Sequence, residues 1–218
     1  TLTDTDNYGL SLVLGGGDIN LLELSCAYSV FATEGNYVRP VSILKVMDSD
    51  GNIIEQNQKQ PTKVLDTQIA RQINDILSDN NARAPIFGAN SPLYLPDYQV
   101  AAKTGTTSNL RDGWTMGYTP SFVVGVWTGN NDNSPTRDIG VGIAAPMWNK
   151  VMQKLVSSKP AETFTKPDPI VDRRPVLLGQ LHPGDTNTIL YYVDKNNPSG
   201  PQPQNPASDP QYFLWQTG

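Results

Sequence analysis

The 218-residue sequence contains one cysteine and one histidine, so few routes to metal or thiol chemistry are open. Because Cys26 stands alone, an internal disulfide and a thiolate metal cluster are both excluded. Its apolar helical setting favours a small buried side chain over a reactive thiol. His182 cannot form a two-histidine metal site, and its position before Pro183-Gly184 predicts a solvated loop. We therefore expect neither a metal ion nor a cofactor.

Long apolar runs and clustered positive charge are also missing. No stretch of 18 or more apolar residues occurs, which excludes a membrane-spanning helix within this sequence. The formal net charge of -5 and the pI near 4.8 argue against a nucleic-acid partner, which would require a basic face. The first residue is not methionine, and no charged-then-apolar leader follows it. Any targeting signal or membrane anchor is therefore expected upstream.

Capping residues and apolar spacing predict three helices. Asn20 with Glu23 three residues later resembles a capping box, so a helix should run from there to about Thr33. Apolar side chains at positions i, i+4, i+7 and i+8 predict an amphipathic helix over Thr67–Ser78. Pro146 is typical of a helix start and opens the third helix.

Apolar and β-branched runs that end at turns predict five strands. Together with the helices, they indicate an α/β fold of the α+β kind. Two strands flank the turn at residues 48–52, and three follow one another later: Val41–Val46 and Ile53–Ile54, then Val100–Thr107, Trp114–Tyr118 and Phe122–Gly129.

The composition changes after Lys159. Ten of the 18 prolines lie between Pro160 and Pro210, which excludes long helices and central strands from that segment. We therefore expect residues 1–158 to form the folded domain. Residues 159–218 should be a proline-rich tail or the start of a further module.

The run from Lys103 to Thr107 has the chemistry of an anion-binding strand. Lys103 supplies positive potential, Thr104 and Thr106 supply hydroxyl donors, and Gly105 lets a substrate backbone approach closely. Taken alone, Lys-Thr-Gly is also explained by a solvated edge strand whose lysine discourages aggregation. The surrounding sequence decides between the two interpretations.

Several separate blocks resemble the transpeptidase domain of class A (bifunctional) penicillin-binding proteins, and they occur in that family's order. The resemblance covers about Asn7 to Val156. It implies a serine β-lactamase/penicillin-binding-protein-like fold, an antiparallel sheet of five strands flanked by helices, of which this chain should supply three. The blocks are Tyr8–Gly16, Leu21–Ala32, Lys103–Trp114, Gly117–Pro120, Gly125–Asn130 and Ala144–Trp148.

The resemblance implies acyl transfer through a serine ester in bacterial cell-wall synthesis. In the family, a Ser-x-x-Lys serine attacks the D-Ala-D-Ala bond of a peptidoglycan stem peptide, and an amine of a neighbouring stem takes the acyl group. β-Lactams mimic the dipeptide and trap the ester. Carried over by motif, Lys103 would lie beside the catalytic groups. Thr104 and Thr106 would bind the substrate carboxylate, and the Thr106 backbone N–H would form half of the oxyanion hole.

Two short matches to the family's other motifs are interpreted as accidents. Ser42-Ile-Leu-Lys45 fits Ser-x-x-Lys, but a strand would place the two side chains on opposite faces, whereas the motif needs one helix face. Ser78-Asp-Asn80 fits Ser-x-Asn, but it follows blocks that should come after the true motif. We therefore expect the nucleophile, and any glycosyltransferase domain, upstream in a membrane-anchored, extracytoplasmic parent protein. The missing part of the same domain would be a partner of this chain.

Two alternatives stay open at this point. A complete small hydrolase of the β-lactamase or D,D-carboxypeptidase kind would use Ser42 and would be labelled there by a penicillin. A non-catalytic wall-binding or interaction module would use the segment after Lys159, and it would need neither Lys103 nor Thr104.

Overall fold

The computed structural model describes residue 2, residues 8–136, residues 142–169 and a few single residues between 194 and 207. The chain divides into two compact units, Thr1–Pro167 and Asp168–Gly218. In the second unit, the described residues Asp194 and Asn197 form an antiparallel bridge. His182 lies outside the described residues.

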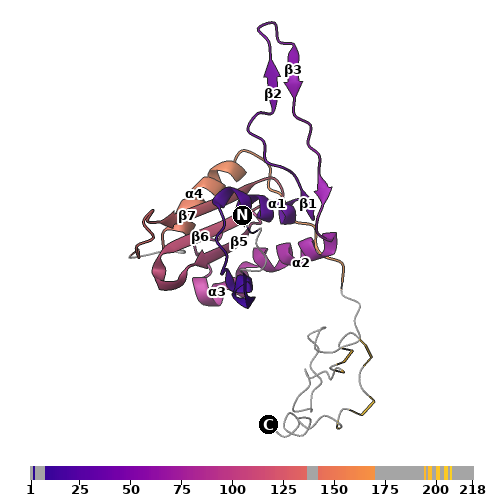
Figure 1. Cartoon of the computed structure of the whole chain (residues 1–218), viewed down its shortest axis with the longest axis vertical. Coiled ribbons are helices and arrows are strands. Elements are labelled where there is room, and N and C mark those ends of the chain that lie inside the picture. Colours follow the sequence, from indigo (N-terminus) through magenta and orange to yellow (C-terminus); the bar gives the residue numbers. More distant parts are fainter. Residues whose placement is uncertain are drawn as a thin grey trace. The chain divides into compact units, whose positions relative to one another are not determined.

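A three-stranded antiparallel sheet forms the centre of the first unit (Figure 1). Each strand boundary lies within two residues of the prediction, so the three long predicted strands are confirmed. The strands occur in the order β5 (Ala101–Thr106), β6 (Asp112–Tyr118) and β7 (Val123–Gly129).

The three predicted helices are also present, with α4 slightly longer than expected. The Asn20 side chain accepts a hydrogen bond from the Glu23 N–H at 2.8 Å, which confirms the predicted N-cap. The last helix begins two residues before Pro146, so this proline lies within the first turn, where its missing N–H costs nothing. The helices are α1 (Leu21–Ala32), α2 (Thr67–Ser78) and α4 (Ala144–Val156).

Helices cover both faces of the sheet, which gives the first unit three layers. On one face, a Cβ added to Gly125 would meet side-chain atoms of Leu21 and Ser25 at 2.8 Å, so glycine permits the close approach of α1. On the other face, a Cβ on Gly117 would lie 2.2 Å from the indole of Trp148 in α4. These two glycines therefore set the distance between the sheet and its helices.

The α4 face holds the larger apolar core. Trp148 and Met152 are fully buried at its centre. They pack against sheet residues and the segment that precedes β5, and the buried members are Leu93, Leu95, Val100, Ala102, Val124, Ala145, Trp148, Met152 and Val156.

The opposite face is organised around the buried Tyr118. Its hydroxyl donates to Asn74 Oδ1 of α2 at 2.7 Å, and Asn74 Nδ2 donates to the Phe31 carbonyl of α1 at 3.0 Å. The ring of Tyr118 contacts those of Phe31 and Phe164, with centroids 6.3 and 5.6 Å away. This network fixes α1 and α2 to β6. The contact of Phe164 with Tyr118 shows that the chain following α4, which still belongs to the first unit, packs against the sheet.

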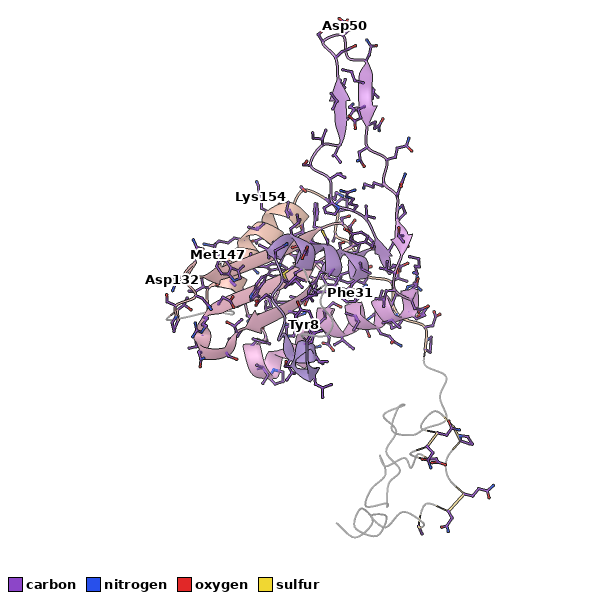
Figure 2. All side chains as sticks on the ribbon, viewed as in Figure 1. Tyr8, Phe31, Asp50, Asp132, Met147 and Lys154 are labelled. Carbon is purple, nitrogen blue, oxygen red and sulfur yellow. The ribbon has the colours of Figure 1, made fainter. Side chains whose placement is uncertain are left out.

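A narrow hairpin projects from the rest of the unit, with Asp50 at its tip (Figures 1 and 2). At its base, β1 (Asn36–Tyr37) pairs with β4 (Thr62–Lys63). At its end, β2 (Lys45–Met47) pairs with β3 (Ile53–Gln56). The predicted first strand is thus too long, because residues 41–44 lie before β2 without strand pairing.

Three short helices were not predicted from the sequence: the 3-10 helices η2 (Leu10–Leu14) and η3 (Ser108–Leu110), and α3 (Asn80–Phe87). The carboxylate of Asp79 caps α3 by accepting from two backbone N–H groups, and Pro85 stands inside the helix. Among the described residues, no helix is both long and apolar enough to cross a membrane.

Candidate functional site

The Lys-Thr-Gly sequence lies on β5, at the edge of the sheet. β6 pairs with one side of β5, and no strand pairs with the other side among the described residues. Lys103 and Thr106 are exposed, while Thr104 and Gly105 are partly buried. The Lys103 Nζ donates to the Thr104 carbonyl at 2.6 Å, so its charge stays close to the strand. The four predicted residues thus share one accessible strand edge.

The four residues alternate between the two faces of that edge. Lys103 pairs with Met116 and Gly105 with Trp114, on the face that carries α1 and α2. Thr104 and Thr106 project on the α4 face. A ligand that extends along the edge could therefore meet the ammonium from one side and the hydroxyls from the other.

Packing does not require the glycine at position 105. A Cβ added to Gly105 would lie 3.4 Å from the Cβ of Trp114, which is an ordinary contact. Gly117 differs sharply, because a Cβ there would overlap the Trp148 indole. A methyl group could therefore fit at position 105, so the fold alone does not explain the glycine, whereas the close approach of a ligand backbone would.

Two tryptophans form a platform on the Gly105 face of the sheet. The rings of Trp114 and Trp127 meet edge to face, with centroids 6.5 Å apart. The Trp127 indole N–H donates to Asp112 Oδ2 at 3.0 Å. No role for these two tryptophans could be predicted from the sequence, because their contacts depend on the pairing register of the strands.

Hydrogen bonds hold the loop that joins β5 to β6 both across its base and against the loop after β7. Thr107 and Asp112 close it: the Thr107 N–H donates to the Asp112 carbonyl at 3.2 Å, and the Asp112 N–H donates to Thr107 Oγ1 at 3.0 Å. At its tip, Arg111 donates to the Asn133 carbonyl at 2.6 Å, and the Thr136 N–H donates to the Leu110 carbonyl at 2.8 Å. The loop after β7 thus holds the end of the Lys-Thr-Gly hairpin.

The "Penicillin binding protein transpeptidase domain" family matches residues 5–153, more than half of the chain. The chain belongs to this family.

Curated relatives agree with the penicillin-binding protein assignment. Penicillin-binding protein 1A of Aquifex aeolicus is 33% identical over 160 residues, which are 72% of this chain and 21% of the relative. Penicillin-binding protein 1A of Neisseria lactamica is 31% identical over 169 residues, 74% of this chain and 21% of the relative. The chain therefore spans about one fifth of the length of these curated relatives.

Solved penicillin-binding proteins share the fold. PonA1 from Mycobacterium tuberculosis has a TM-score of 0.64 and 25% identity, and the match covers 73% of this chain and 44% of that chain. Penicillin-binding protein 1A from Haemophilus influenzae has a TM-score of 0.62 at 22% identity, covering 74% of this chain and 30% of that chain. The serine β-lactamase/penicillin-binding-protein-like fold inferred from sequence is confirmed.

The two short motif matches, Ser42–Lys45 and Ser78–Asn80, lie on different parts of the first unit. Ser42 is exposed in the irregular segment before β2, and Lys45 begins that strand, so the two residues share no helix face. Ser78 is the last residue of α2, and its hydroxyl accepts from Gln99 at 3.2 Å. Asn80 donates to the Ala89 carbonyl. The Ser42–Lys45 match therefore lacks the helical geometry with which a Ser-x-x-Lys pair activates a serine.

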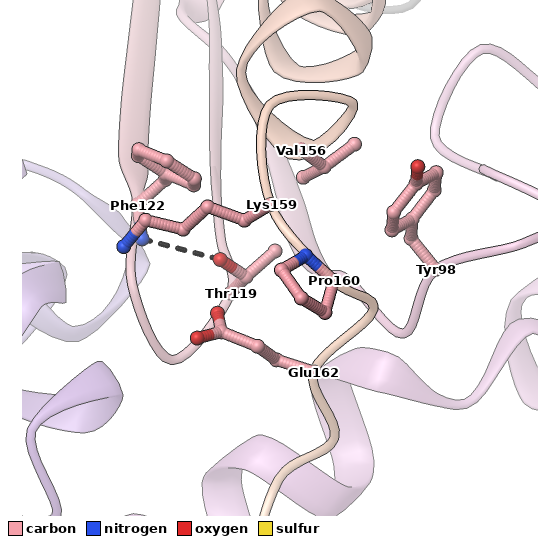
Figure 3. Close-up of a pocket in the computed structure, with 7 residues that line it drawn as sticks. All are labelled: Tyr98, Thr119, Phe122, Val156, Lys159, Pro160 and Glu162. Carbon is pink, nitrogen blue, oxygen red and sulfur yellow. Dashed lines mark hydrogen bonds between the residues drawn. The ribbon is translucent and has the colours of Figure 1, made fainter.

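The pocket in Figure 3 lies at the opposite end of the sheet from Thr106. It is bordered by the β6–β7 turn and the end of α4, and the space inside it, about 10 Å³, holds about one water molecule. Lys159 lies over the Phe122 ring, 5.1 Å from its centroid, and the Ser121 hydroxyl donates to Glu162 at 2.6 Å. These contacts join the β6–β7 turn to the segment that follows α4 and indicate a structural role. The lining residues are Tyr98, Thr119, Phe122, Val156, Lys159, Pro160 and Glu162.

Buried titratable groups elsewhere support the fold rather than a second reactive site. Burial raises the pKa of the partly buried Cys26 thiol, and the nearby Glu23 raises it further, which disfavours the reactive thiolate. Burial also raises the pKa of Tyr118, with a smaller contribution from Tyr28. Within the described part of the chain, no group of three or more His, Cys, Asp or Glu residues could hold a metal ion.

Proposed function

We propose that this chain is the substrate-binding part of a peptidoglycan D,D-transpeptidase, a serine acyltransferase. The observation that carries the proposal is the open edge of β5, where Lys103, Thr104, Gly105 and Thr106 lie together in a chain of this family. No other strand of the described sheet combines an ammonium, hydroxyl donors and a glycine that packing does not require.

The chemistry of this edge suits a peptide that ends in a carboxylate. The Lys103 ammonium would supply a favourable potential for the terminal carboxylate of a D-Ala-D-Ala stem. The hydroxyls of Thr104 and Thr106 would donate hydrogen bonds to it. The backbone N–H of Thr106 would stabilise the oxyanion that forms when a serine attacks the carbonyl. The same groups would bind the carboxylate of a β-lactam, and one of the PonA1 structures is of a complex with penicillin V.

The attacking serine would come from a segment outside these 218 residues. Two facts support this: Ser42 lacks a lysine on the same helix face, and the curated relatives are about five times longer than the match. The rest of the catalytic domain would then be the chain's obligatory partner. The parent protein would act at the extracytoplasmic face of a bacterial membrane. Residues 159–218 would form a tail or further module, with its first residues, up to Pro167, fastened to the catalytic part.

Acylation of the full-length protein by a fluorescent penicillin tests the proposal. Lys103→Ala should lower the second-order acylation rate by about 10²–10³, as expected when a main electrostatic group is removed from an oxyanion-type site. Lys45→Ala is the matched control, because Lys45 is an exposed strand lysine of the same chain and belongs to the competing Ser42 motif.

The two lysines distinguish the proposal from the small-hydrolase alternative. The proposal requires that Lys45→Ala be labelled at the wild-type rate. If instead Lys45→Ala abolishes labelling and Lys103→Ala leaves it unchanged, β5 is not the substrate strand and Ser42 becomes the better nucleophile.

A further inference from the structure

An acidic side chain outside the Lys-Thr-Gly motif lies at the loop end of the hairpin that β5 and β6 form. Asp112 opens β6, directly after the loop that follows Thr106 and Thr107. It shares a sheet face with Trp114, two residues on, and therefore with Gly105, the cross-strand partner of Trp114. The Asp112 carboxylate thus lies on the Lys103 side of the sheet, beyond Gly105.

One oxygen of the Asp112 carboxylate accepts a hydrogen bond, and the other has no hydrogen-bond partner among the described residues. Oδ2 accepts the Trp127 indole N–H at 3.0 Å, and Oδ1 is buried without a hydrogen-bond partner. A buried unpaired oxygen is costly, so an aspartate that serves only stability would be a poor choice here.

A glycine on β7 makes room for this contact. Gly129 is the cross-strand neighbour of Asp112. A Cβ added to Gly129 would lie 2.6 Å from the Trp127 ring and 2.8 Å from the Asp112 Cβ. The indole and the carboxylate therefore occupy the space that a side chain at 129 would fill, and the pair is held in a single arrangement.

From Trp127 the contact continues to the substrate strand. Its ring meets that of Trp114 edge to face, and Trp114 is the cross-strand partner of Gly105, with its Cβ 3.4 Å from where a Gly105 Cβ would lie. Asp112 thus orients Trp127, Trp127 orients Trp114, and Trp114 supports the strand between Thr104 and Thr106. A shift of the strand by about 1 Å would misplace both carboxylate-binding hydroxyls and the oxyanion N–H.

We propose that Asp112 is a positioning residue for acylation, which acts through the Trp127 indole and the Trp114 ring on the Gly105 segment of β5. This inference rests on the proposed transpeptidase function. Asp112 touches neither the substrate nor the reacting atoms, so its effect should follow the hydrogen bond to Trp127 rather than its negative charge.

The test measures the second-order rate of acylation by a fluorescent penicillin, and the melting temperature, for variants of the full-length protein. Asp112→Ala and Trp127→Phe should each lower the rate about tenfold, the worth of one lost hydrogen bond of this kind. The double variant should be no slower than the slower single variant, because both changes break one contact. Asp112→Asn retains an acceptor for the indole and should stay within about twofold of wild type.

Trp148→Phe is the matched control for an effect of stability alone. Trp148 is fully buried on the opposite face of the sheet, and its indole N–H has no hydrogen-bond partner among the described residues. This variant should lower the melting temperature and leave the acylation rate unchanged. If Asp112→Ala does not fold, the Trp127→Phe and Asp112→Asn variants still carry the test.

The outcomes separate this inference from the proposed function. If wild type is labelled and Trp127→Phe is labelled equally fast, or if the losses multiply in the double variant, Asp112 does not position the strand although the proposed function stands. If Asp112→Asn is as slow as Asp112→Ala, the charge acts and not the hydrogen bond, which also overturns the inference. If wild type is not labelled at all, the proposed function and the inference fall together.

Discussion

The two edges of the central sheet have opposite chemistry. The outer edge of β5 carries an exposed lysine and two threonines, whereas β7 and the preceding Phe122 read Phe-Val-Val-Gly-Val-Trp-Thr-Gly without a charge or a proline. Neither edge has a partner strand among the described residues. A polar edge resists pairing with another strand and stays available to a ligand, whereas an uncharged edge invites pairing. We infer that the edge of β5 stays accessible to a substrate, and that the edge of β7 pairs with another strand in the full-length protein.

The largest expected difference is in penicillin labelling between the isolated chain and the full-length protein, because only the latter would contain the nucleophilic serine. The isolated chain should form no covalent adduct with a fluorescent penicillin, while the full-length protein should be labelled. Loss of an activated nucleophile costs on the order of a millionfold in rate in serine hydrolases. A labelled band from the isolated chain that disappears in Ser42→Ala and survives in Ser11→Ala would contradict this expectation.

The edge of β7 should control the solution behaviour of the isolated chain. With its backbone donors and acceptors unpaired beside apolar side chains, the chain should self-associate or unfold at modest temperature. Light scattering and thermal unfolding measure both properties. A monodisperse monomer that unfolds cooperatively above about 60 °C would mean that the chain covers this edge itself.

Two glycines distinguish an open site from a packed one. Gly105→Ala should fold with little change in stability, because its Cβ meets only an ordinary contact, and it should slow acylation by obstructing the approach of the substrate. Gly117→Ala should destabilise the protein by about 1–3 kcal/mol or more, since its Cβ would overlap the Trp148 indole. Melting curves and acylation rates of the full-length variants check both outcomes. Equal rates for wild type and Gly105→Ala would argue against a ligand beside this glycine.

The smallest expected effect is the alkaline loss of stability through Tyr118, on the face away from α4. Because its pKa is raised in the folded state, the unfolded chain loses this proton first as the pH rises, and stability should fall above about pH 10. Tyr118→Phe should cost about 1–3 kcal/mol at neutral pH by leaving Asn74 Oδ1 without its donor. It should also weaken the alkaline loss of stability. Urea unfolding at pH 7 and pH 10.5 measures both, and identical alkaline losses in the two proteins would remove Tyr118 as the cause.

Much of the fold could be predicted because local signals and tertiary contacts agree. The helix over Thr67–Ser78 follows from its apolar spacing, and the three long strands follow from apolar runs bounded by turns. The helix α3 was missed because Pro85 and its polar neighbours oppose a helix, and the cap at Asp79 overrides them. The hairpin strand that begins at Lys45 was predicted too long, because the apolar residues at 41–44 are exposed and lie outside the strand pairing.

The candidate site likewise has a part that local sequence predicts and a part that depends on tertiary contacts. Lys103, Thr104, Gly105 and Thr106 are adjacent in sequence, so a motif could name them. Asp112 and Trp127 meet only after two strand pairings are set, and no local pattern encodes that contact.

A crystal structure of the full-length protein acylated by a penicillin tests the central claim most directly. We expect the carboxylate of the bound antibiotic to lie along the outer edge of β5, within about 2.5–3.0 Å of the hydroxyls of Thr104 and Thr106. The ester would be formed by a serine outside these 218 residues. An ester on Ser42, or a carboxylate bound away from β5, would contradict it.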